Sequence, residues 1–140
     1  MIEANYLIIL ACTVFGVALG TLWYGPLFGK QWCKLNGVDP NNKVEVARMK
    51  KGMAPVMLLQ FLLTLFQVYV LFFYIKGAEA EMDGVTNALW LWAGFVVPTL
   101  AASVLWTNES KKQQKKRFLL QAGFNLVSFV AFALIIVQWG

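Results

Sequence analysis

The sequence contains no histidine and only two cysteines in 140 residues, and charged residues make up 14% of it. Without histidine, the chain lacks the side chain that most often serves general acid–base catalysis and metal binding near neutral pH. Cys12 and Cys33 are expected at different depths, and no cluster of carboxylates accompanies them, so neither a disulfide nor a metal site is predicted. Catalysis would depend on Glu109, Asp39 or Cys33 alone. We therefore expect a protein without a cofactor or metal that is not an enzyme.

Charge is also absent from four long stretches of the chain. All twelve Lys and Arg residues and all seven Asp and Glu residues lie outside Ala4–Gly29, Gly52–Ile75, Gly84–Asn108 and Phe118–Gly140. Each stretch exceeds the roughly 20 residues that an α-helix needs to cross a hydrocarbon core about 30 Å thick. A hydrophobic content of 59% is also too high for a soluble domain of this size. The sequence predicts an all-α membrane protein in which one domain, residues 1–140, forms a bundle of four transmembrane helices, with spans at about 5–25, 53–75, 85–106 and 118–139.

The basic residues predict how the chain is oriented. Eleven of the twelve follow the first or the third apolar stretch, namely Lys30, Lys34, Lys43, Arg48, Lys50, Lys51, Lys111, Lys112, Lys115, Lys116 and Arg117. The remaining one, Lys76, shares its connection with Glu79, Glu81 and Asp83. By the positive-inside rule, we expect a multi-pass protein of the cell (inner) membrane, with loops 26–52 and 107–117 cytoplasmic and both termini extracytoplasmic. A basic loop between spans favours anionic lipid headgroups as partners rather than nucleic acid.

The decamer "WYGPLFGKQW", Trp23–Trp32, lies where the first span reaches its first positive charge. Gly25-Pro26 is expected to break the helix, with Pro26 in the first turn of a new one. Phe28, Trp32 and Leu35 then follow an i, i+4, i+7 spacing, which predicts a short amphipathic helix in the membrane interface that ends at Asn36-Gly37. This element is expected to anchor the chain. Alternatively, it forms a lipid or partner site in which Lys30 meets a phosphate; the candidate residues are Trp23, Tyr24, Gly25, Pro26, Phe28, Lys30 and Trp32.

The segment "ALGTLWYGPLFGKQW" closely resembles the signature of a family of small bacterial membrane proteins, the domain of unknown function 1761 family. "LWLWAGFVVPTLAASVLW", the second basic connection and "GFNLVSFVAFALIIVQW" are similar to the second half of that family, so the resemblance covers nearly the whole chain. The resemblance implies an integral membrane protein of four helices. It implies no reaction, substrate or catalytic residue.

Uncharged polar residues are spaced along two of the predicted spans. Gln60, Thr64 and Gln67 stand at i, i+4, i+7, and Gln121, Asn125 and Ser128 repeat the spacing in the fourth span. Gln60 and Asn125 are expected at nearly equal depth, where they could face each other. Gly16 and Gly20 form a small-xxx-small face in the first span. These faces predict helix packing, or else a polar bundle interior that accepts water or a solute.

The two halves of the chain also resemble each other. "ALGTLW", ending at Trp23, aligns with "AASVLW", ending at Trp106, and a basic connection follows each segment. The match suggests two parallel helical hairpins. Pro98, inside the third span, should kink that helix because proline cannot donate a backbone hydrogen bond.

Three classes of function are compatible with these features. The leading expectation is a non-enzymatic packing, assembly or binding protein, with Gly16 and Gly20 as the face through which a homo-oligomer would form. The alternative is a passive channel or permease for a small solute. A proton-coupled pump is disfavoured, since no ionisable group lies inside a predicted span. An enzyme is the least favoured class.

Overall fold

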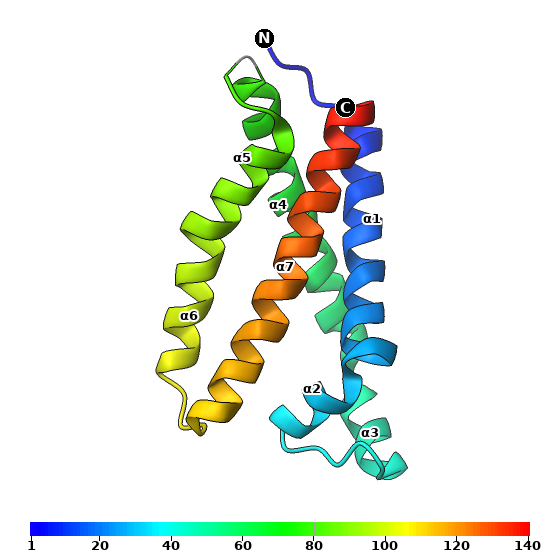
Figure 1. The fold of residues 1–140 in the computed structure, drawn as a ribbon. Helices are drawn as coiled ribbons and strands as arrows, with labels where there is room; N and C mark the ends of the chain where they lie inside the picture. Colours follow the sequence, from blue (N-terminus) through cyan, green and yellow to red (C-terminus); the bar gives the residue numbers. More distant parts are fainter. Residues whose placement is uncertain (80) are drawn as a thin grey trace.

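The computed structural model describes residues 1–79 and 81–140, and every regular element in these residues is helical. Four helical stretches are long and apolar enough to cross a membrane, which confirms the predicted all-α class. Figure 1 shows the order of the elements. They are α1 (Tyr6–Leu22), the wide π-helical turn η1 (Trp23–Leu27), α2 (Gly29–Leu35), α3 (Lys43–Lys50), α4 (Met53–Ala78), α5 (Gly84–Leu91), the second π-helical turn η2 (Trp92–Val96), α6 (Val97–Leu105) and α7 (Lys111–Trp139).

The helices extend beyond the uncharged stretches at some of their ends. α7 begins at Lys111 rather than near Phe118, because Ser110 and Gln113 form a capping box in which each side chain bonds the backbone of the other residue. α3 was not anticipated from the sequence, and Asn42 caps its start by accepting hydrogen bonds from the backbone N–H groups of Val44 and Glu45. The turn that ends α2 was anticipated, and Gly37 there has a positive φ of 73°.

The hydrophobic core lies in the half of the bundle nearest the chain termini. Most of its fully buried side chains come from the start of α1 and from the last turns of α4 and α7; they include Ile9, Phe72, Ile75, Phe132 and Ile136. The first turns of α4 contribute nothing to this core, because Met53–Gln60 is exposed at every position. Figure 1 shows α7 crossing between α1 and the α5–α6 stretch. α7 is therefore the central helix of the bundle.

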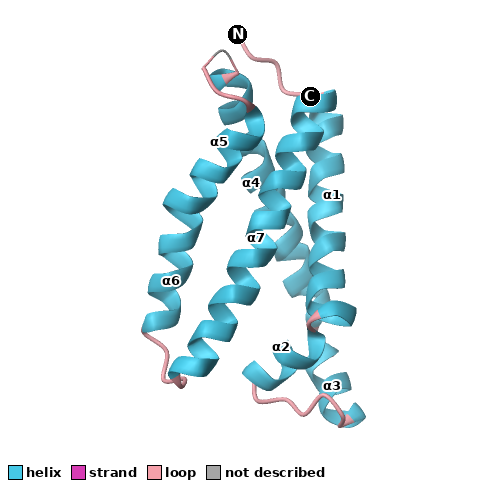
Figure 2. Cartoon of the chain, in the orientation of Figure 1, coloured by secondary structure: helices cyan, strands magenta, loops and turns pink. Residues whose placement is uncertain are grey.

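Both basic connections lie at one end of the molecule, which we call the basic end (residues 28–52 and 106–117). Figure 1 places α2, α3 and the start of α7 at this end, and places both termini, the last turn of α4 and the start of α5 at the other. Figure 2 shows that short loops join the helices at the basic end. The eleven positive charges predicted to share one side of the membrane therefore share one end of the fold.

Each of the two π-helical turns accompanies a proline. Pro26 has no N–H to donate to the carbonyl four residues earlier. The backbone hydrogen bonds therefore shift to the carbonyl five residues earlier, and the Phe28 N–H donates to the Trp23 carbonyl at 2.9 Å. The prediction that Gly25-Pro26 breaks the helix was therefore wrong: the helix widens there and continues to Leu27, and the next helix begins at Gly29. At the second site, the Val97 N–H donates to the Trp92 carbonyl just before Pro98. The irregularity expected at Pro98 thus takes the form of a wide turn.

Candidate functional site

The aromatic side chains of the decamer form a cluster at the basic end. The ring centroids of Tyr24 and Trp32 are 4.7 Å apart, and those of Trp23 and Phe28 are 4.8 Å apart. Phe124 of α7 joins the cluster at 5.5 Å from Tyr24. All five rings are partly buried, and each pair is tilted, an arrangement that aromatic rings favour. η1 and α2 are therefore packed against α7.

Arg117 joins three parts of the basic end. Its guanidinium binds the carboxylate of Glu109, with the Nη2 donor 2.6 Å and the Nε donor 2.9 Å from Oε1. The same Nη2 donates to the backbone carbonyl of Leu35 at 2.9 Å, and the guanidinium carbon lies 5.4 Å from the centroid of Trp32. Since the side chains of Arg117 and Glu109 are only 15% and 21% exposed, water weakens this pair less than a surface pair. Arg117 therefore holds the end of α2 onto the start of α7.

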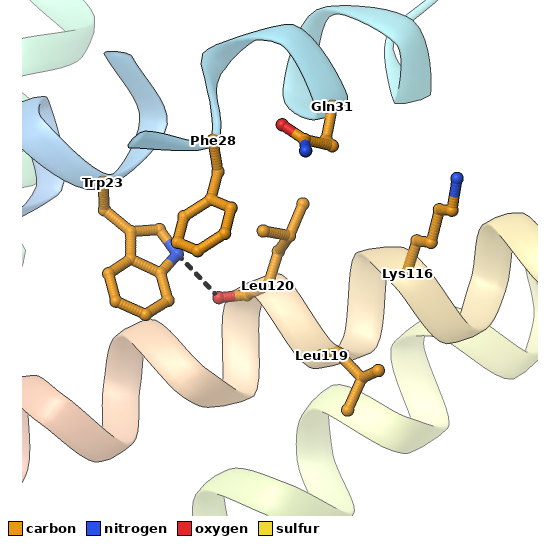
Figure 3. Close-up of a pocket in the computed structure, with 6 residues that line it drawn as sticks. All are labelled: Trp23, Phe28, Gln31, Lys116, Leu119 and Leu120. Carbon is orange, nitrogen blue, oxygen red and sulfur yellow. Dashed lines mark hydrogen bonds between the residues drawn. The ribbon is translucent and has the colours of Figure 1, made fainter. Parts of the chain in front are cut away.

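Trp23 is attached to α7 by a hydrogen bond as well as by packing. Its indole N–H donates to the backbone carbonyl of Leu120 at 3.1 Å (Figure 3). A methyl group on Gly123 would lie 3.3 Å from Cζ2 of Trp23, so a glycine at this position lets the indole approach the helix closely. Trp92, the first residue of η2, repeats the arrangement and donates to the carbonyl of Ala122 at 2.9 Å.

A hollow of about 390 Å³ lies beside this cluster. Figure 3 shows the side chains that line it, which come from η1, from Phe28, from α2 and from α7. They are Trp23, Phe28, Gln31, Lys116, Leu119 and Leu120. Lys30 is exposed on α2 and is not part of the lining. The cation that lines the hollow is instead Lys116, which nothing in the sequence distinguishes from its basic neighbours.

Comparison with protein families identifies the family to which the chain belongs. A family model described as a protein of unknown function (DUF1761) matches residues 7–137. The chain belongs to this family. The resemblance predicted from the decamer and from the second half is therefore confirmed. Comparisons with curated proteins and with solved structures found no match.

In this member of the DUF1761 family, the polar residues of the predicted spans divide between the interior and the surface. Thr64 and Ser128 are buried, whereas Gln60 and Gln67 are exposed and Gln121 and Asn125 are partly buried. Gln60 donates to the hydroxyl of Thr64 at 3.1 Å, and Asn125 donates to the carbonyl of Gln121 at 2.8 Å. Gln60 and Asn125 were expected to face each other, but each side-chain amide donates to a group in its own helix.

The small-residue face of α1 is filled from inside the chain. A methyl group on Gly16 would lie 2.7 Å from Cζ of Phe132 and 3.2 Å from Cγ2 of Thr64, so α1 packs closely against α4 and α7 at Gly16. Gly20 has more room, with Phe124 at 3.4 Å. A second copy of the chain would therefore need a different surface from the one expected at Gly16.

The aromatic residues of the site were predicted from the sequence, but their partners on α7 were not. Arg117 was counted only as part of a basic loop, and Phe124, Leu120 and Gly123 only as parts of an apolar span. One feature of the sequence could have indicated this pairing. Gly123 and Phe124 lie a few residues after the basic run, at the depth in the membrane expected for the aromatic decamer. Their pairing with the decamer, however, depends on which helix lies next to α1.

Proposed function

We propose that this protein is a non-enzymatic assembly protein of the cell membrane that associates with further copies of itself through α4. The observation that supports the proposal is a line of exposed residues along α4 at alternating spacings of three and four. The line comprises Gln60, Leu63, Gln67, Val70 and Tyr74. This is the a/d spacing through which two helices pack as a coiled coil. We call these five residues the α4 seam.

The α4 seam is left open by the rest of the chain. Leu63, Val70 and Tyr74 are 56%, 51% and 49% exposed, whereas α4 buries a separate set of side chains in the core, which includes Thr64, Val68 and Ile75. α4 thus has one surface for its own bundle and another that nothing in the described residues covers.

A second copy fits the seam because amide groups are self-complementary. Gln67 lies near the middle of a 26-residue helix, where exposure of an amide to hydrocarbon is unfavourable. Two copies in one membrane share an orientation, so a two-fold axis along the membrane normal brings Gln67 opposite the partner's Gln67. Each amide then has both a donor and an acceptor to exchange.

The packing of the interior supports assembly over the alternative of a passive channel. Phe132 and Thr64 both pack against Gly16, so side chains fill the bundle interior at this level. A channel would make a cysteine at position 64 reactive toward water-soluble thiol reagents, and we expect it to be protected. We also propose that the basic end lies in the cytoplasm, because it carries eleven of the twelve Lys and Arg residues.

Cysteine cross-linking in native membranes tests the proposal. In a variant with Cys12→Ala and Cys33→Ala, we expect Leu63→Cys and Val70→Cys to form disulfide-linked dimers under mild oxidation. Leu62→Cys is the matched control, because Leu62 is 50% exposed but lies off the seam. Gln67→Leu should lower the dimer yield of Leu63→Cys. Equal cross-linking at positions 62 and 63, or none at 63 and 70, would contradict association through the seam.

A further inference from the structure

The hollow beside Trp23 lies at the boundary between charged and apolar sequence. On α7, a run of basic residues ends at Arg117 and an uncharged stretch begins at Phe118, and the hollow takes Lys116 from one side of this boundary and Leu119 and Leu120 from the other. In a membrane, this boundary coincides with the level where lipid headgroups meet acyl chains. The hollow therefore faces both parts of a lipid molecule.

The floor of the hollow is apolar and held in place. Trp23 cannot turn away without losing the hydrogen bond to the Leu120 carbonyl, and Phe28 packs on its ring at 4.8 Å. Because that bond uses the indole N–H, the floor presents ring and aliphatic carbon rather than a donor. A preformed apolar surface of this kind favours binding of a hydrocarbon chain, since little ordering is needed.

The rim of the hollow carries two donors. Figure 3 shows the amide of Gln31 on α2 and the ammonium of Lys116 on α7, two of the side chains that line the hollow. In the part of the chain that the structure describes, Arg117 forms an ion pair with Glu109 and Lys116 forms none. The acidic residue nearest in sequence to Lys116 is therefore already neutralised, and the rim keeps a net positive charge.

We propose that the hollow binds one anionic phospholipid. The phosphate accepts hydrogen bonds from Nζ of Lys116 and from the Gln31 amide, and the first part of an acyl chain lies against Phe28, Leu119 and Trp23. A volume of about 390 Å³ admits a headgroup and the adjoining glycerol region, while the remaining chains extend into the bilayer. Because the rim carries an uncompensated cation, a lipid with net negative charge binds better than a zwitterionic one.

Binding of individual lipids to the purified full-length protein tests this site. Native mass spectrometry in detergent gives the apparent affinity for the first molecule of phosphatidylglycerol or phosphatidylcholine. We expect Lys116→Gln to weaken phosphatidylglycerol binding by about tenfold, the size of one charge-assisted hydrogen bond. Lys115→Gln is the matched control, since Lys115 is also exposed on α7 but does not line the hollow, and it should change the affinity by less than twofold.

Two further measurements separate a lipid site from simpler explanations. Leu119→Asn leaves the charges intact and should weaken phosphatidylglycerol binding while the thermal midpoint of the lipid-free protein stays unchanged, because Leu119 is exposed. Glycerol phosphate, the headgroup without chains, should not displace the lipid. Equal losses from Lys115→Gln and Lys116→Gln, equal affinity for phosphatidylcholine, or displacement by glycerol phosphate would each overturn the proposal. None of these variants alters the α4 seam, so this site and self-association succeed or fail separately.

Discussion

Trp23 and Trp92 donate their indole N–H groups to backbone carbonyls only two residues apart on α7, those of Leu120 and Ala122. Residues two apart on an α-helix point about 200° from each other, so the two indoles approach α7 from opposite sides. Each tryptophan is also the first residue of a π-helical turn. The two wide turns thus hold the central helix between them.

Replacing either tryptophan by phenylalanine should destabilise the protein measurably. Trp23→Phe and Trp92→Phe keep an aromatic ring but remove the indole N–H. We expect each to lower the free energy of unfolding by about 0.6–1 kcal/mol, the usual net size of such a hydrogen bond. Unfolding in mixed detergent micelles measures the difference. Trp106→Phe is the control and should have no effect, because Trp106 is 90% exposed; a similar loss at all three positions would argue against the indole bonds.

Gly16 should tolerate no side chain. Gly16→Ala places a methyl group against the buried ring of Phe132, and we expect it to lower the free energy of unfolding by about 1–3 kcal/mol, as overpacked cores do. Gly94→Ala is the control, because no heavy atom lies within 4 Å of the added methyl group; it should leave the free energy of unfolding unchanged or raise it in the same unfolding measurement. Adding Phe132→Leu to Gly16→Ala should restore part of the loss. If it restores nothing, Phe132 is not what limits the space at Gly16.

Stability should depend on pH through the cap of α5. The hydroxyl and then the backbone N–H of Thr86 donate to Asp83 and hold the pKa of its carboxyl below the ordinary value. A lowered pKa in the folded state means that the ionised cap stabilises the fold above about pH 4, the ordinary aspartate pKa, and that this stabilisation is lost as the pH falls through the folded-state pKa. The thermal midpoint of the wild type should therefore fall toward that of Asp83→Asn on acidification. A constant difference between pH 6 and pH 3 would contradict this role.

Topology reporters should find both chain termini on the extracytoplasmic side. The prediction follows from the eleven Lys and Arg residues at the basic end and the single Lys76 at the other. A reporter fused after Gly140 should behave as extracytoplasmic, and one inserted within Asn41–Glu45 as cytoplasmic. A cytoplasmic reporter signal after Gly140 would reverse the orientation.

The predictable part of the candidate site was its aromatic half. Trp23, Phe28 and Trp32 could be recognised because an aromatic cluster at the end of an apolar stretch is a local pattern. Lys30 was considered for a phosphate because it lies in the same decamer, whereas the cation that lines the hollow is Lys116, from a segment more than 80 residues later. Similarly, "AASVLW" drew attention to Trp106, although Trp92 is the tryptophan that matches Trp23 in its contacts.

Local properties explain what the sequence by itself determined. Helix class, the four apolar stretches and the grouping of the basic residues follow from hydropathy, length and charge, and each can be evaluated within about 20 residues. Tertiary structure alone decided that Gly16 packs against Phe132, that Arg117 joins Leu35 to Glu109, and that Gln67 is left on the surface. In an apolar helix nearly every face is compatible with lipid, so hydrophobic periodicity does not indicate which face is buried. That choice depends on side-chain shape and hydrogen bonding between helices, which exist only once the helices are adjacent.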